Sequence, residues 1–240
     1  MSDISAQSQS ATVKTKTRTS KPRLFWVGMV LFLIVMVVLG FGSTYGRQLV
    51  LGQEISAHVA LETDWVIHLH AAVFVGWMLF LLSQTILASR GRIQTHMTLG
   101  GYGGIVLGLA IVVVGTLVTF ASAQDAVSKG IITPAEAPFG YAPLILVDSW
   151  YGLLSFVLLV GLGLFYRRSA EAHKRYMIFG TIMIVFAATS RMDYLLGSWA
   201  NLIGMGLMVA PLLAYDLYSD GSLHTATLVG TSVAALHLAV

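Results

Sequence analysis

WVIHLHAAVFVGWMLFLLSQTILA, residues 65–88, contains no Asp, Glu, Lys or Arg. A helix of about 20 predominantly apolar residues crosses the roughly 30 Å hydrocarbon core of a bilayer. Helices and closed barrels are the structures that satisfy all their backbone hydrogen bonds there. The stretch therefore predicts a transmembrane helix, and it raises the question of why two histidines stand near its start.

The whole chain has the same character. Its 240 residues are 56% hydrophobic and 10% charged, with a mean hydropathy of +0.79, whereas charged residues make up roughly a quarter of a soluble domain. We expect an all-α integral membrane helical bundle, with a disordered basic tail over 1–23 and a single transmembrane domain over 24–240. Seven spans are predicted, at 24–42, 65–88, 99–122, 143–166, 176–196, 200–218 and 223–240.

The basic residues divide unevenly between the two sides of this topology. With the N-terminus inside, five in the tail and six in later inner segments make eleven, against three outside. The positive-inside rule favours that orientation. We therefore expect a multi-pass protein of a bacterial inner membrane, with a cytoplasmic N-terminus and an external C-terminus. The net charge of +3 then reflects topology, so we expect the lipid bilayer and other membrane subunits as partners, and no nucleic acid.

The residues that are missing exclude several chemistries. The chain has no cysteine, which rules out disulfides, thiolate-bound iron–sulfur clusters and haem attached through Cys-x-x-Cys-His. The last predicted span has no lysine, which rules out a retinal Schiff base there. Non-covalent haem and a metal site built from histidine and carboxylate remain open.

Two segments resemble each other and suggest an internal repeat. RGRIQTHMTLGGYG (90–103) and RRSAEAHKRYMIFG (167–180) each place arginines, then a histidine, then a glycine before an apolar span. This pattern predicts that spans 2–3 and 4–5 form two parallel helical hairpins. The histidines, His96 and His173, are candidate axial ligands of one cofactor. They could instead be helix-start residues among arginines near anionic lipid headgroups.

A second polar pattern follows one face of residues 65–88. His70, Trp77 and Gln84 are seven residues apart, and successive sevens drift only about 20° around a straight helix. His68 points the other way, and Asp64, one turn earlier, is its expected partner. The stripe of three therefore predicts a polar face that turns toward the bundle interior.

Ionisable residues in other spans lie at a similar depth to His70. Intramembrane ionisable groups usually face the bundle interior and pair with one another. One interpretation is structural: Asp148 and Arg191 form an ion pair, while His70 bonds a backbone carbonyl. The other is a cofactor or metal site built from the same residues, to which Asp193 and His237 could contribute.

The runs HLHAAVFVGWMLFLLSQTILASRGRIQTHMTLGG (68–101) and AEAHKRYMIFG (170–180) carry a resemblance. They are similar to a set of small bacterial multi-pass membrane proteins of unassigned function. There is a looser likeness to membrane b-type cytochromes, in which histidines on a four-helix core hold haem. That likeness implies non-covalent haem b. Where those cytochromes have a histidine, span 4 offers Asp148, so an outer haem would need His70 with His237 or His68.

Three functions remain open from the sequence. The leading one is a redox or electron-transfer subunit, with haem b bound by the residues His70, His96, His173, Trp77, Gln84 and Arg191. A second is a metal-dependent membrane enzyme, holding a zinc, copper or iron ion through His70, His96, His173, Asp148 or Asp193. The third is a non-enzymatic accessory subunit or transporter, in which the polar core is structural.

Overall fold

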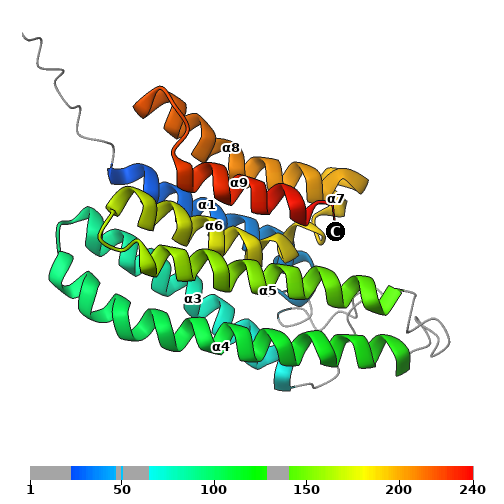
Figure 1. Cartoon of the computed structure of the whole chain (residues 1–240). Coiled ribbons are helices and arrows are strands. Elements are labelled where there is room, and N and C mark those ends of the chain that lie inside the picture. Colours follow the sequence, from blue (N-terminus) through cyan, green and yellow to red (C-terminus); the bar gives the residue numbers. More distant parts are fainter. Residues whose placement is uncertain (1–22, 47–49, 51–64, 129–140, 240) are drawn as a thin grey trace, which may run out of the picture.

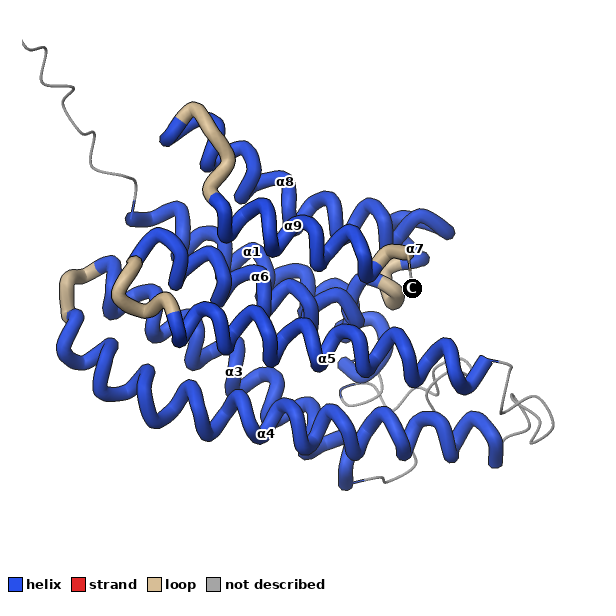
Figure 2. The backbone as a smooth tube through the Cα atoms, in the orientation of Figure 1, coloured by secondary structure: helices blue, strands red, loops and turns tan. Residues whose placement is uncertain are grey.

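The structure is a computed structural model that describes residues 23–46, 50, 65–128 and 141–239. These residues form helices and short turns, with no strand among them (Figure 2). The predicted all-α bundle is confirmed, while the predicted tail lies, apart from Arg23, outside the described residues. In chain order the elements are α1 (Arg23–Phe41), η1 (Gly42–Gly46), α3 (Trp65–Ser89), α4 (Ile93–Ser128), α5 (Tyr141–Phe165), α6 (Ala170–Thr189), α7 (Asp193–Leu196), η2 (Gly197–Trp199), α8 (Ala200–Asp220) and α9 (Thr225–His237).

The long helices run side by side, and the two predicted hairpins are present (Figure 1). α3 packs on α4, and α5 packs on α6. Both hairpins turn at the same end of the bundle, where α8 also turns into α9 (Figure 1). We call this the hairpin end, defined by the turns 90–92, 166–169 and 221–224. The opposite end carries α7 and the C-terminus, and we call it the C-terminal end.

The turn between α3 and α4 shows why the first hairpin closes where it does. Gly91 has φ of +74°, in the left-handed region that an L side chain rarely adopts. The amide of Arg92 donates to the carbonyl of Leu87 at 2.9 Å, which satisfies an end-of-helix acceptor in the manner of a Schellman motif. This turn ends α3, and α4 begins directly after it at Ile93.

The number of membrane spans differs from the prediction. Five helices among the described residues are long and apolar enough to cross a bilayer, namely α1 with η1, α3, α4, α5 and the α7–α8 segment. The predicted spans at 176–196 and 223–240 do not reach that standard. The helix for the latter, α9, has 13 residues, or about 20 Å at 1.5 Å per residue. It is too short for a 30 Å core.

Helix α6 is not among these five, and it lies at the centre of the bundle. It packs against α1, α5, α8 and α9, and 14 of its 20 residues are buried. Glycines on the surrounding helices allow this close approach: a Cβ at Gly204 would collide with Thr189, and one at Gly230 with Phe179. Because α6 is surrounded by protein, it carries polar and charged residues that a lipid-facing helix would not.

Candidate functional site

His96 and His173 lie together at the hairpin end. Each stands in the first turns of the second helix of its hairpin, α4 for His96 and α6 for His173. Their ring centroids are 6.2 Å apart and the ring planes are nearly perpendicular, at 80°. Both side chains are half-buried. The fold thus brings together the two histidines that the sequence repeat placed in equivalent positions.

The hydrogen bonds of His173 leave one nitrogen open. Its Nδ1 lies 2.8 Å from the carbonyl oxygen of Gly163 on α5. A carbonyl only accepts, so Nδ1 carries the hydrogen, and in a neutral ring Nε2 then has a free lone pair. Histidines that bind metals are usually oriented in this way, by a backbone carbonyl on the other nitrogen. Nδ1 of His96 is buried and has no hydrogen-bond partner within the described part of the chain.

A buried amide on α3 packs against α4 close to the turn that carries His96. Gln84 on α3 is 5% exposed, and neither its oxygen nor its nitrogen has a hydrogen-bond partner among the described residues. Its Oε1 would be 3.0 Å from a Cβ at Gly100, which lies one turn beyond His96 on α4. An unmade hydrogen bond in a buried group costs about 1–3 kcal/mol. An amide left in this state is a candidate for binding water or a ligand.

The other members of the predicted stripe also face inward. Trp77 is 0% exposed, and its indole Nε1 donates to Oγ1 of Thr181 on α6 at 3.1 Å. Its ring packs edge-on against Phe156 at 5.1 Å. The one polar atom of Trp77 thus makes a contact between α3 and α6. That Trp77 lines a cofactor stays a prediction.

His70, near the start of α3, and Arg191, just after α6, both lie toward the C-terminal end. The guanidinium of Arg191 lies 4.6 Å from the centre of the Phe41 ring. Its Nη1 donates to the carbonyl of Ala187. The His70 ring stacks on Phe74 with centroids 4.1 Å apart. Nδ1 of His70 is buried without a hydrogen-bond partner among the described residues, so the predicted bond to a carbonyl is not made by this atom.

The predicted ion pair between Asp148 and Arg191 is wrong. Oδ1 of Asp148 on α5 lies 2.9 Å from Nε2 of His237 on α9. Arg191 has no carboxylate within salt-bridge distance in the described ranges. The sequence could not separate these partners, because the choice depends on how α9 packs against α5 and α6.

The structure also bears on two smaller expectations. His68 was expected to pair with Asp64, which lies outside the described residues. Nδ1 of His68 lies 2.7 Å from the hydroxyl of Tyr45. Across residues 23–46, 65–128 and 141–239 no group of three or more His, Asp or Glu side chains is placed to hold a metal ion. His70, Asp148 and Asp193 therefore do not assemble as a three-ligand site.

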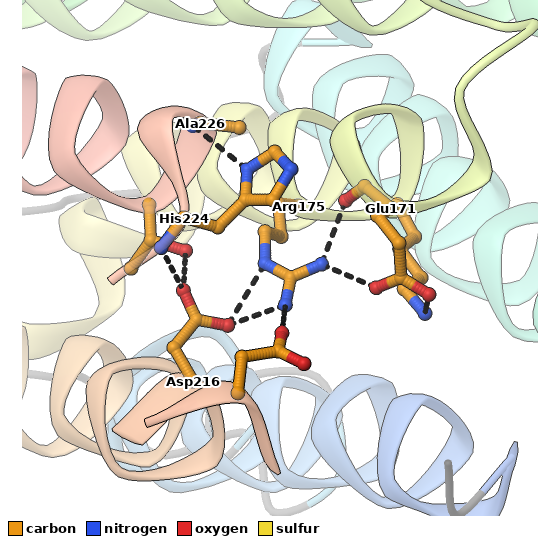
Figure 3. A network of polar contacts seen from close by, with 8 residues as sticks. Glu171, Arg175, Asp216, His224 and Ala226 are labelled. Carbon is orange, nitrogen blue, oxygen red and sulfur yellow. Dashed lines mark hydrogen bonds and ion pairs between the residues drawn. The ribbon is translucent and has the colours of Figure 1, made fainter. Parts of the chain in front are cut away.

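A buried ionic network at the hairpin end was not predicted (Figure 3). Arg175 on α6 is 0% exposed and Asp216 on α8 is 1% exposed in their side chains, and the two form an ion pair through Nη2 of the arginine. Nε of Arg175 donates to the same carboxylate oxygen at 3.0 Å. Its Nη1 donates to the backbone carbonyl and the carboxylate of Glu171.

The second oxygen of Asp216 ties the start of α9 into this network. It accepts from the backbone amide of His224 at 2.9 Å and from the hydroxyl of Thr227. His224 in turn caps α9, because its Nδ1 accepts from the amide of Ala226 at 3.0 Å (Figure 3). The available sequence signal was Asp216 itself, a single acid inside an apolar span, and such residues usually have a partner.

Together, five apolar helices and polar clusters buried between them fit a multi-pass helical membrane protein. Comparison of the chain with protein-family models, with curated proteins and with solved structures finds no match.

Proposed function

We propose that this chain is a membrane-embedded electron-transfer subunit that binds one non-covalent b-type haem between His96 and His173. The observation that carries the proposal is the separation of their rings. Two imidazoles on opposite sides of one metal ion, each with a metal–nitrogen bond of about 2 Å, have ring centres about 6 Å apart. The centroids of His96 and His173 are 6.2 Å apart.

The chemistry of the surrounding groups supports the same assignment. Haem iron takes its axial ligands from protein imidazoles, and four of its six ligand positions come from the porphyrin. Two histidines are therefore enough, and no third protein ligand is needed. The bond from His173 to the carbonyl of Gly163 holds that ring in the tautomer a metal ligand needs. When bound, haem iron supplies one-electron redox chemistry.

Charged groups at the hairpin end suit the carboxylates of such a cofactor. Arg92 and Arg168 are exposed in the two hairpin turns, and a guanidinium binds a carboxylate through paired hydrogen bonds. Lys174, a third candidate, is already bound to Glu171 at 2.8 Å. We assign the propionate carboxylates to Arg92 and Arg168. The inner-membrane location and the cytoplasmic hairpin end belong to the same proposal, and the basic residues support them.

Absorption spectroscopy tests the proposal directly. The full chain is expressed with a haem precursor supplied and is purified in detergent. We expect a Soret band and a sharp reduced α-band in the natural chain, and loss of both in His96→Ala and His173→Ala. His70→Ala is the matched control, because His70 lies on α3 toward the C-terminal end, away from His96 and His173. This variant should keep the spectrum. Size-exclusion chromatography and circular dichroism verify that each variant is folded.

Any of three results would reject haem binding at this pair. The first is a folded natural chain with no haem after supply of the precursor. The second is a spectrum that persists in His96→Ala and His173→Ala but is lost in His70→Ala, which would move the cofactor to the C-terminal end. Retention of haem in all three variants would also contradict the assignment.

A further inference from the structure

A histidine–carboxylate pair far from His96 and His173 has no role in the proposed haem site. Nε2 of His237, in the last turn of α9, lies 2.9 Å from Oδ1 of Asp148 on α5. Both residues lie toward the C-terminal end, because α9 runs away from the hairpin end and α5 runs toward it (Figure 1). The contact joins residues 89 positions apart in the chain.

The two side chains differ sharply in exposure. The side chain of His237 is 2% exposed and that of Asp148 is 52% exposed. Asp148 is the eighth of the 25 residues of α5, so it lies in the first third of the helix, on the side of the C-terminal end. A buried titratable ring is thus connected by one hydrogen bond to a carboxylate that reaches the surface.

The ring of His237 is enclosed by helices on its other sides. Phe186 from α6 has its ring centroid 4.4 Å away, and Tyr151 from α5 has its centroid 4.9 Å away. Gly152 has no side chain there, and a Cβ would stand 3.4 Å from Cε1 of the histidine. The Tyr151 hydroxyl donates to the carbonyl of Val233, so it does not bond the imidazole. Among the described residues, Asp148 is the charged group that contacts the ring.

Nδ1 of His237 is buried and lacks a hydrogen-bond partner within the described ranges. An ionised Asp148 accepts hydrogen bonds and cannot donate, so the hydrogen of a neutral ring is on Nε2. Nδ1 then carries a lone pair directed into the protein. The imidazole has one nitrogen coupled to the surface and one free nitrogen inside, which is the arrangement a proton relay requires.

We propose that Asp148 and His237 form a proton-transfer site between the aqueous surface and the α5–α6–α9 interface. A water or hydroxyl group on the inner side gives a proton to Nδ1 and is left deprotonated. The Nε2 proton passes to Oδ1 of Asp148, and the carboxylic acid releases it to bulk water. The ring ends neutral with its hydrogen on Nδ1, and the reverse steps restore the first tautomer.

Nuclear magnetic resonance of histidine labelled with ¹⁵N tests this independently of haem. The full chain is placed in lipid nanodiscs, and the Nε2 proton of His237 is identified by its loss in His237→Gln. We expect this buried proton to exchange with water much faster than the indole proton of Trp77, which is equally buried but has no carboxylate beside it. Asp148→Asn retains an acceptor for Nε2 but cannot take up a proton. Exchange should slow by on the order of a hundred-fold.

Asp193→Asn is the matched control, because Asp193 is an exposed acid in α7 at the same end of the bundle. It should leave exchange unchanged. A purely structural bond that anchors α9 would be preserved in Asp148→Asn, and exchange would then match the natural chain. That result overturns the proposal, as does a His237 proton in the natural chain that exchanges as slowly as the Trp77 indole.

Discussion

The guanidinium of Arg175 and the carboxylate of Asp216 form an ion pair closed off from solvent, with side-chain exposures of 0% and 1%. The pair connects the central helix α6 to α8, and through the second oxygen of Asp216 it also holds the start of α9. Desolvating two charges is costly unless each is well hydrogen-bonded. Here both charges have several further partners, so the network holds α6, α8 and α9 together at the hairpin end.

Removing one member of this pair should lower the free energy of unfolding strongly, whereas replacing both members with apolar residues should not. Arg175→Met leaves the Asp216 charge buried, and we expect it to lower the free energy of unfolding by about 3–5 kcal/mol. The double change Arg175→Met with Asp216→Leu should recover most of that loss. Lys174→Met removes a partly exposed pair with Glu171 and should cost about 1 kcal/mol or less. Denaturant unfolding in detergent micelles measures all three, and equal small losses would contradict the network's importance.

The hydrogen bond between Trp77 and Thr181 is a second point of contact between helices. Thr181→Val keeps the shape but leaves the indole N–H buried without an acceptor, which should cost about 1–3 kcal/mol of unfolding free energy. Thr85→Val is the control, because the Thr85 hydroxyl bonds only carbonyls of its own helix, at Leu81 and Leu82. Thermal unfolding followed by tryptophan fluorescence compares them. Similar stability for both variants would show that the interhelical bond contributes little.

Close packing of α9 on α6 depends on Gly230. A Cβ at this position would collide with the ring of Phe179, and Phe179 is itself 0% exposed, so it has little room to move. Gly230→Ala should destabilise the protein by about 1–3 kcal/mol through overpacking. Gly161→Ala on α5 meets nothing within 4 Å and should be neutral, or stabilising by up to about 1 kcal/mol. The melting temperature should therefore fall in Gly230→Ala and stay unchanged or rise in Gly161→Ala.

The cap on α9 should make stability depend on pH. Burial and the neighbouring Arg175 lower the pKa of His224 below its ordinary value of 6.5. The folded chain therefore binds fewer protons there than the unfolded chain, so this stabilisation is present above pH 6.5 and is lost as the pH falls through the folded pKa. Protonation would also remove the Nδ1 acceptor that caps α9. His224→Asn keeps a capping side chain that does not titrate. The decrease in melting temperature as the pH falls below 6.5 should therefore be smaller in this variant than in the natural chain.

The absence of cysteine permits a clean test of orientation. Ser169 in the α5–α6 turn and Ser198 in η2 are both exposed and lie at opposite ends of the bundle. In intact cells a membrane-impermeant thiol reagent should label Ser198→Cys and leave Ser169→Cys unlabelled, because the proposed topology has the hairpin end in the cytoplasm. The reverse labelling pattern would invert the proposed topology. Labelling after permeabilisation verifies that both thiols can react.

Some side-chain positions could be predicted because they follow from periodicity. Trp77 and Gln84 are buried as the seven-residue spacing indicated, and His96 and His173 meet because two similar hairpins turn at one end. Pairings between helices remote in sequence could not be predicted in this way. Asp148 binds His237, and Asp216 binds Arg175, because of the rotation and register of α8 and α9 against the central helix. No spacing within a single helix encodes that register.

The amino-acid sequence by itself determined that this chain is a helical membrane protein, because long uncharged runs have few other stable structures in lipid. It also determined the two hairpins, through glycine and arginine turns between apolar runs. Only the tertiary structure decided that α6 is enclosed by other helices, that α9 is too short to span a bilayer, and which acid faces which base. Those outcomes depend on how whole helices pack, and packing is a property of surfaces formed by residues far apart in the chain.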